Sequence, residues 1–274
     1  NEIYVVDFIS DTNETVITFS NELDENVKLE KRALSLFLQG REIKRYRLLP
    51  SGKMAIIPYR LENGKAIFNS PEYMKQNYPR TLEYLMRNKT FLENREKGKM
   101  RGANWYAYVY PKNIELMKQS KILIPDIADR AQFALDENGD YAFTSGYGIT
   151  IRDDCELSPK YVLGLLNSKL LELYLKHVST PMQNGFFRFF TQYMEQIPIR
   201  SLNFDNPPDK ARHDRMVSLV GRMLELHKQS PRTPQEKEHL AREIQSTDKA
   251  IDALVYELYG LTEEEIKIVE GLAP

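Results

Sequence analysis

Positive charge clustered around one glycine is the clearest chemical signal in this sequence. Gly40 lies in the stretch 38–47, whose charged and aromatic members are Arg41, Glu42, Lys44, Arg45, Tyr46 and Arg47. A glycine can adopt backbone angles closed to other residues and lets the chain approach a surface closely. In a helical turn or a short extended segment, Arg41, Lys44 and Arg45 would fall largely on one side. The pattern favours a corner that grips phosphate groups, although a solvated loop leading into a core strand has the same composition.

A second basic stretch follows at residues 87–106, where cations clearly outnumber anions and the only tryptophan of the chain stands near the end. Basic residues interleaved with large aromatics are typical of nucleic-acid surfaces, because cations neutralise phosphates while flat rings stack on bases. The candidates are Lys97, Lys99, Arg101 and one of Trp105 or Tyr106. The alternative, which we expect for at least one of the two aromatics, is an anchor in the core beneath a charged flap.

A third polar group stands in residues 179–193. Asn184-Gly185 indicates a tight turn there, and Arg188 has two phenylalanines on either side. Four phenylalanines are too many for a solvated loop, so most of them should lie in the core. Gln183, Asn184 and Arg188 remain as candidates for reading DNA base edges or shape, because arginine pairs well with guanine and asparagine or glutamine with adenine.

The sequence predicts neither a catalytic centre nor a metal site. Asn206-Pro207-Pro208 begins like the motif that stacks on a flipped adenine, but Asp209 replaces the aromatic residue and no glycine-rich cofactor loop precedes it. Asp126 follows a proline as in some metal nucleases, yet no Glu-x-Lys follows at short range. The four histidines lack metal-ligand spacing, and no nucleophile-elbow sequence is present.

Composition narrows the class of protein. The chain has 274 residues and a net charge of −1, which argues against a uniformly basic nucleic-acid coat. Cations slightly exceed anions in residues 1–200 and anions exceed cations in 201–274, so a polyanion should contact the first part. Cys155 is the only cysteine, as expected for a protein of the reducing cytosol. We expect a cytoplasmic protein with no membrane partner, and a chain that is a piece of something longer because it begins with Asn1.

Apolar periodicity predicts an α+β fold, with a mixed sheet of short hairpins packed with helices and a C-terminal α-helical hairpin. The predicted hairpins pair residues 3–9 with 15–19, 53–59 with 65–68, and 131–135 with 141–144. The predicted helices span 29–38, begin at Pro79 and Ser158, and form two long segments after Asp205, before a short last helix capped by Thr262. We expect a recognition domain at 1–200 and the helical hairpin with its terminal helix at 201–274.

Several blocks of the chain together resemble one family. They are Gly40–Tyr46, Tyr78-Pro79 with Tyr84-Leu85, Lys121–Ile127, Leu163–Leu170, Met194–Ile199 and the tail Leu254–Ile266. Their order is similar to that of the TaqI-like C-terminal specificity domain, the target-recognition part of adenine-specific DNA methyltransferases and of fused type IIG restriction-modification enzymes. The similarity covers roughly residues 26–200 and the tail.

The resemblance implies a non-catalytic domain that binds double-stranded DNA sequence-specifically. The parent enzyme would carry a separate methyltransferase domain using S-adenosylmethionine to methylate adenine, in some cases with a nuclease, while this part would hold no cofactor. Base-contacting positions vary with the target, so none is carried over. The alternative from another class is a protein–protein interaction or assembly module that uses the acidic helical hairpin and does not bind DNA.

Overall fold

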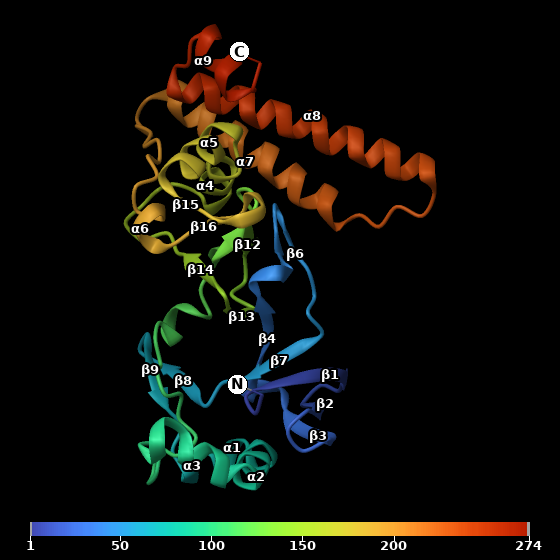
Figure 1. Ribbon diagram of the computed structural model, residues 1–274, viewed down its shortest axis with the longest axis vertical. Helices are drawn as coiled ribbons and strands as arrows, with labels where there is room; N and C mark the ends of the chain where they lie inside the picture. The colour runs from blue at the N-terminus through green and yellow to red at the C-terminus, as the bar shows by residue number, and fades with distance from the viewer. Residues whose placement is uncertain (1, 273–274) are drawn as a thin grey trace. The chain divides into compact units, whose positions relative to one another are not determined.

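The computed structural model describes residues 2–272 and shows the expected mixture of helices and small sheets (Figure 1). The chain divides into two compact units, each assembled from three segments. Unit 1 comprises Asn1–Leu38, Pro50–Gln119 and Asn138–Phe143. Unit 2 comprises Gln39–Leu49, Ser120–Glu137 and Thr144–Pro274. The stretch around Gly40 thus belongs to unit 2, although most of its neighbours in sequence belong to unit 1.

Within the described residues 2–272, unit 1 is built on a six-stranded sheet with the strand order β13-β4-β7-β1-β2-β3. Its strands are β1 (Val5–Asp11), β2 (Thr15–Ser20), β3 (Glu25–Glu30), β4 (Leu34–Gln39), β7 (Lys53–Ile56) and β13 (Tyr141–Thr144). The first predicted hairpin is confirmed, because β1 and β2 pair antiparallel. The second turn signal, Asn63-Gly64, is also confirmed, but it joins β8 (Tyr59–Glu62) to β9 (Lys65–Phe68), while β7 pairs with β1 and β4.

The helix predicted over residues 29–38 is wrong. Strand β3 ends at Glu30, a short 3-10 turn covers Lys31–Ala33, and β4 follows. Leu34 packs into the main core of unit 1 and Phe37 into a smaller cluster with Ala55 and Ala142. A strand that is covered on both faces needs apolar residues at successive positions, and their spacing then imitates a helix.

Three helices accompany the sheet of unit 1: α1 (Pro71–Asn77), α2 (Pro79–Arg87) and α3 (Lys89–Gly98). Pro79 begins α2 as predicted. The carboxylate of Glu30 on β3 accepts hydrogen bonds from the backbone N–H of Arg80 at 3.0 Å and of Thr81 at 2.9 Å. Since the first N–H groups of a helix have no partner within it, this carboxylate both caps α2 and fixes it against the sheet.

Unit 2 contains two three-stranded sheets and a hairpin within the described residues. One sheet has the order β12-β10-β14, and the other β11-β16-β15. Their strands are β10 (Lys121–Pro125), β11 (Ile127–Ala128), β12 (Ala134–Asp136), β14 (Gly146–Ile149), β15 (Thr180–Pro181) and β16 (Phe187–Arg188). The hairpin predicted around Gly139 is wrong, because β12 pairs with β10 while β13 joins the sheet of unit 1.

The core helix predicted from Ser158 is two helices, α4 (Pro159–Leu166) and α5 (Lys169–Val178). Ser158 caps the first as expected, and Ser168 caps the second by accepting the N–H of Leu171. Between them the Asn167 side chain accepts from the backbone N–H of Phe133 and donates to its carbonyl, at 3.0 and 2.9 Å. These tertiary hydrogen bonds interrupt an apolar stripe that would otherwise favour one continuous helix.

The predicted C-terminal helical hairpin is present as α7 (Pro207–Lys228) and α8 (Pro234–Tyr259), which lie side by side (Figure 1). The short helices α6 (Thr191–Met194) and α9 (Glu263–Val269) complete unit 2, and Thr262 forms the predicted capping box of α9. Buried residues of α7 and α8 share one core with α4, α5 and β10. In structural terms the hairpin therefore belongs with unit 2, while the functional division at residue 200 stays a prediction.

No helix among residues 2–272 is both long and apolar enough to cross a membrane.

Candidate nucleic-acid interface

The corner at Gly40 is built by close backbone packing. A Cβ atom on Gly40 would lie only 2.3 Å from the carbonyl oxygen of Ser145. Glu42, at the end of the 3-10 turn Gly40–Glu42, accepts a hydrogen bond from the N–H of Gln39 at 2.7 Å and closes a capping box. A glycine is therefore required at position 40 because the chain passes close to the backbone of Ser145, and not because of unusual backbone angles.

Strands β5 (Ile43–Lys44) and β6 (Arg47–Leu48) form a tight hairpin directly after this turn. Lys44 is the cross-strand partner of Arg47, so the two cationic side chains leave the same face, and both are exposed. Arg41 is 72% exposed and contacts Glu42 at 2.6 Å. Arg47 was not among the predicted contacts; its pairing with Lys44 across a two-residue turn is the signal that could have identified it.

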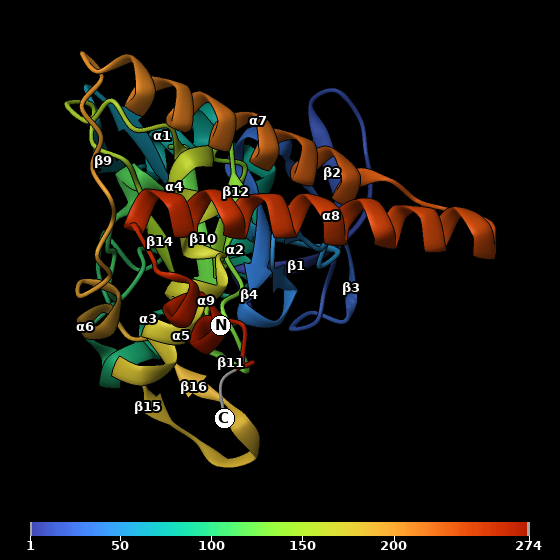
Figure 2. The ribbon, with the colours of Figure 1, turned by 90° about the horizontal axis from the view of Figure 1, so that it is seen from above.

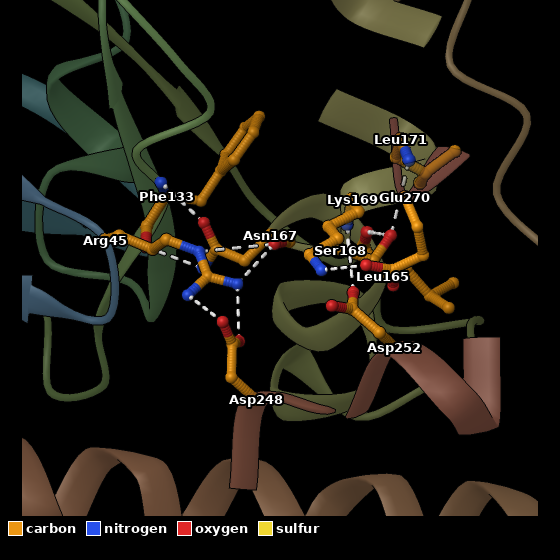
Figure 3. A network of polar contacts seen from close by, with 10 residues as sticks. All are labelled: Arg45, Phe133, Leu165, Asn167, Ser168, Lys169, Leu171, Asp248, Asp252 and Glu270. Carbon is orange, nitrogen blue, oxygen red and sulfur yellow. Dashed lines mark hydrogen bonds and ion pairs between the residues drawn. The ribbon is translucent and has the colours of Figure 1, made fainter. Parts of the chain in front are cut away.

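The Arg45 side chain contacts the helices of unit 2 (Figure 3). Its guanidinium forms two hydrogen bonds with Asp248 of α8, at 2.6 and 2.9 Å, and donates to the carbonyl of Asn167 at 2.7 Å. Lys169 donates its backbone N–H to Asp252, one turn further along α8, at 2.9 Å. Arg45 was predicted to contact phosphate, but the structure places it in this internal network, which fastens the Gly40 corner to the helices.

Asp252 makes this network sensitive to pH. Burial, helped by the nearby charge of Asp248, raises the pKa of Asp252 from 3.8 to about 6. Between these values the folded chain holds a proton that the unfolded chain has lost, so this group's contribution to stability is present below about pH 4 and is lost as the pH rises through 6.

Asp252→Asn keeps an oxygen that can accept from Lys169 and cannot ionise. Relative to the parent chain, its free energy of unfolding should rise by on the order of 2 kcal/mol between pH 4 and pH 7. Urea unfolding at both pH values measures this, with Glu238→Gln, an exposed carboxylate of the same helix, as control. A difference between variant and parent that does not change with pH would contradict the assignment.

Arg41 and Lys44 border an open pocket of about 400 Å³ in unit 2, which we call the corner pocket. Its lining also includes Asp126, which directly follows β10, and Phe186 from the loop before β16. The Gly40 corner and the aromatic segment 179–193 are far apart in sequence, yet they meet at this pocket.

The β15–β16 hairpin carries the third predicted group of residues and projects from the rest of unit 2 (Figure 2). Gln183 and Asn184 are exposed at its tip, where Asn184 and Gly185 both have positive φ, 62° and 75°. Arg188 pairs through its backbone with Ile127, and its guanidinium lies 5.2 Å from the ring centre of Phe190.

The four phenylalanines of this segment do not share one environment. Phe189 is fully buried in the core of unit 2, Phe187 packs partly against that core, and Phe190 is half-buried. Phe186 is 41% exposed at the corner pocket. The expectation that most of these rings are core anchors therefore holds fully for Phe189 alone, and Phe186 is available to a ligand.

The second basic stretch lies in unit 1. Lys97, Lys99 and Arg101 are exposed beyond a kink in α3, where Glu96 and Lys97 have positive φ. Trp105 and Tyr106 follow, and both are in the core of unit 1, 7% and 0% exposed. The Tyr106 backbone carbonyl accepts a hydrogen bond from Tyr4 at 2.9 Å. The core alternative raised for these rings thus describes both of them.

Residues 2–272 contain no group of three or more histidine, cysteine, aspartate or glutamate side chains that could hold a metal ion. Cys155 is exposed and unpaired.

Sheets of short strands, a glycine-centred basic corner and a C-terminal helical hairpin define an α+β module with an exposed cationic pocket. The family model described as the TaqI-like C-terminal specificity domain matches residues 35–199, and the chain belongs to this family. Both the Gly40 corner and the β15–β16 hairpin fall within the matched residues.

Relatives of this chain are type II restriction-modification proteins. The chain is 23% identical to the type II restriction enzyme and methyltransferase RM.Eco57I of Escherichia coli, over 83% of this chain and 24% of that protein. It is 26% identical to the type II methyltransferase M.PaeR7I of Pseudomonas aeruginosa, over 71% of this chain and 29% of that protein. The chain therefore spans less than a third of either relative.

A similar fold occurs in a solved structure of the type IIL restriction-modification enzyme MmeI in complex with DNA. The TM-score is 0.54 at 13% sequence identity, and the match covers 88% of this chain and 30% of the MmeI chain.

Proposed function

We propose that this chain is the DNA target-recognition module of a type II restriction-modification enzyme. The observation that carries the proposal is the corner pocket, where exposed cations of the Gly40 corner meet the loop of the β15–β16 hairpin. Membership of a specificity-domain family supports the same conclusion. Arg41 and Lys44 would contact backbone phosphates, and Gln183, Asn184 and Arg188 would read base edges.

Unit 1 would supply further phosphate contacts through Lys97, Lys99 and Arg101, which are exposed on one short segment. Arg45 is left out of the proposed interface because Asp248 holds its guanidinium, and Trp105 and Tyr106 because their side chains are buried in the core of unit 1.

The parent protein would be an N6-adenine methyltransferase, with S-adenosylmethionine bound in a methyltransferase domain outside this chain. Support comes from the two relatives, both named as methyltransferases, of which this chain spans only about a quarter. The partners would be double-stranded DNA and that domain, and the cytoplasm would be the place of action, as the exposed thiol of Cys155 also suggests.

The alternative of an assembly module that does not bind DNA has less support. Apolar residues of α7 and α8 such as Met216, Val220 and Leu254 are buried in the core of unit 2, so they are not available to a partner.

Removing one cation of the corner should weaken binding to all duplexes alike. For Arg41→Ala or Lys44→Ala in the full chain, we expect the magnitude of the negative slope of log K against log salt to decrease by about one per lost phosphate contact. Fluorescence anisotropy with duplexes of unrelated sequence at several salt concentrations measures this. Arg152→Ala, an exposed arginine outside the corner pocket, is the matched control. If Arg41→Ala and Lys99→Ala both leave affinity and salt slope unchanged, the phosphate contacts proposed for each unit are wrong.

Changes at the β15–β16 hairpin should alter sequence preference instead. Asn184→Ala or Arg188→Ala is expected to reduce discrimination at one base pair by about 1–3 kcal/mol and to leave the salt slope nearly unchanged. Selection from a randomised duplex library measures the preference. A uniform loss of affinity over all sequences would instead assign these residues to the DNA backbone.

A further inference from the structure

A second open pocket of about 360 Å³ adjoins the corner pocket in unit 2, and we call it the α7 pocket. Lys44 and Gln132 line both pockets, which makes the two continuous along one surface. The lining of the α7 pocket also includes Arg45, Asp129, Arg130 and His227. It thus combines the hairpin β5–β6, the loop after β11 and the end of α7.

Unpaired positive charge distinguishes the α7 pocket. Lys44 and Arg130 are exposed and form no ion pair with any residue of the described range 2–272, and the same holds for Arg47, the cross-strand partner of Lys44. Arg45 is neutralised by Asp248. The one carboxylate in the lining, Asp129, accepts a hydrogen bond from Gln132 at 3.0 Å. In the lining, Lys44 and Arg130 therefore exceed Asp129 by one positive charge, and Arg47, which is not in the lining but whose charge acts on His227, adds a second.

The pKa of His227 is affected by the positive charge around the pocket. Its ring stacks on Tyr46, with centroids 6.2 Å apart. Burial lowers the pKa of His227 below its ordinary value, the charges of Arg47 and Arg45 lower it further, and Asp248 partly opposes them. Together with Lys44, Asp129 and Arg130 of the pocket lining, these are the charged groups that face the imidazole. The ring can donate an N–H to an anion in both its neutral and its protonated form.

We propose that the α7 pocket seats one phosphate group, held by Lys44, Arg47 and Arg130, with the His227 imidazole as a further hydrogen-bond donor. The inference rests on the proposed function and extends it: the phosphate belongs to the backbone of duplex DNA whose bases face the β15–β16 hairpin. A free phosphate ion has the same chemistry, so the experiment separates the two sources. A seated phosphate offsets the surrounding cations, which raises the pKa of His227 and couples binding to proton uptake.

The test compares the double variant Arg47→Ala/Arg130→Ala with the parent chain. If one phosphate is lost, the salt slope for a short duplex of random sequence falls by about one, and affinity at low salt falls several-fold. Arg152→Ala/Arg222→Ala removes two exposed arginines that line neither pocket and should bind as the parent does. Circular dichroism verifies that both variants fold.

The second readout is the NMR titration of the His227 imidazole with and without duplex. A rise in its pKa on adding duplex, absent in the double variant, supports the proposal. If the double variant binds DNA as the parent chain does, the proposed phosphate site in the α7 pocket is wrong. The proposed function still holds in that case if Arg41→Ala weakens binding. If the parent chain does not bind DNA, the proposed function fails. In that case the titration is repeated with inorganic phosphate in place of duplex. A rise in the pKa of His227 that is absent in the double variant supports a site for free phosphate. An unchanged pKa overturns the proposal.

Discussion

Replacing Lys121 with methionine is expected to lower the free energy of unfolding by about 3–5 kcal/mol, because the substitution leaves the carboxylate of Asp136 buried without its cation. The two side chains are each 2% exposed and lie 2.5 Å apart, Nζ to Oδ2. They are cross-strand partners at the start of β10 and the end of β12. The strand they hold, β10, leads directly into Asp126 and Ile127 of the corner pocket.

The double variant Lys121→Met/Asp136→Leu tests the reason for this loss. Replacing both members of a buried ion pair with apolar residues of similar size is often neutral, whereas removing one member is costly. Urea unfolding followed by circular dichroism should therefore find the double variant close to the parent chain. If it is as unstable as Lys121→Met alone, the loss comes from packing at Lys121 and not from an uncompensated charge.

The second large effect is expected at Arg45. Arg45→Met should lower the free energy of unfolding by about 3 kcal/mol, because Asp248 and the Asn167 carbonyl both lose their hydrogen-bond donor in a partly buried site. Arg41→Met, four residues earlier in the same basic stretch, is the matched control. Its side chain is 72% exposed, and the largely buried Glu42 keeps the hydrogen bond from the Gln39 N–H, so Arg41→Met should cost clearly less stability than Arg45→Met, about 1 kcal/mol or less.

The effects of the same two substitutions on DNA binding should be the reverse of their effects on stability. Arg41→Met is expected to weaken binding while the chain remains stable. Arg45→Met, studied at a temperature where it is still folded, should retain the salt slope of the parent chain if the Gly40 corner keeps its shape. A loss of stability in Arg45→Met that is as small as the loss expected for Arg41→Met would show that the Arg45–Asp248 contact contributes little.

Much of the fold could be predicted from local sequence. The hairpin of β1 and β2, the turn at Asn63-Gly64, the caps at Ser158 and Thr262 and the two long C-terminal helices all occur as expected. Each depends on residues close together in the chain, whose periodicity or turn chemistry favours one local structure. Membership of the family was likewise predicted from short blocks in a fixed order.

The wrong predictions share one physical cause, which is long-range packing. Residues 29–38 have helical spacing, but β4 lies within a sheet and is apolar on both faces. Asn138-Gly139 has the composition of a hairpin turn, yet the strands on either side pair with different sheets. Asn167 interrupts the core helix because its amide bonds to Phe133, a residue distant in sequence.

The sequence by itself determined which chemical groups this protein offers: clustered cations, amide side chains at a glycine turn, and no metal or nucleophile motif. Tertiary structure decided which of them face solvent. Arg41 and Arg45 look equivalent in the sequence, but only Arg45 forms hydrogen bonds with Asp248 of α8. Trp105 and Tyr106 follow a basic stretch but fill the core of unit 1, whereas Arg47 and Arg130 are brought to the surface around His227. Burial depends on partners far away along the chain, and local composition does not record them.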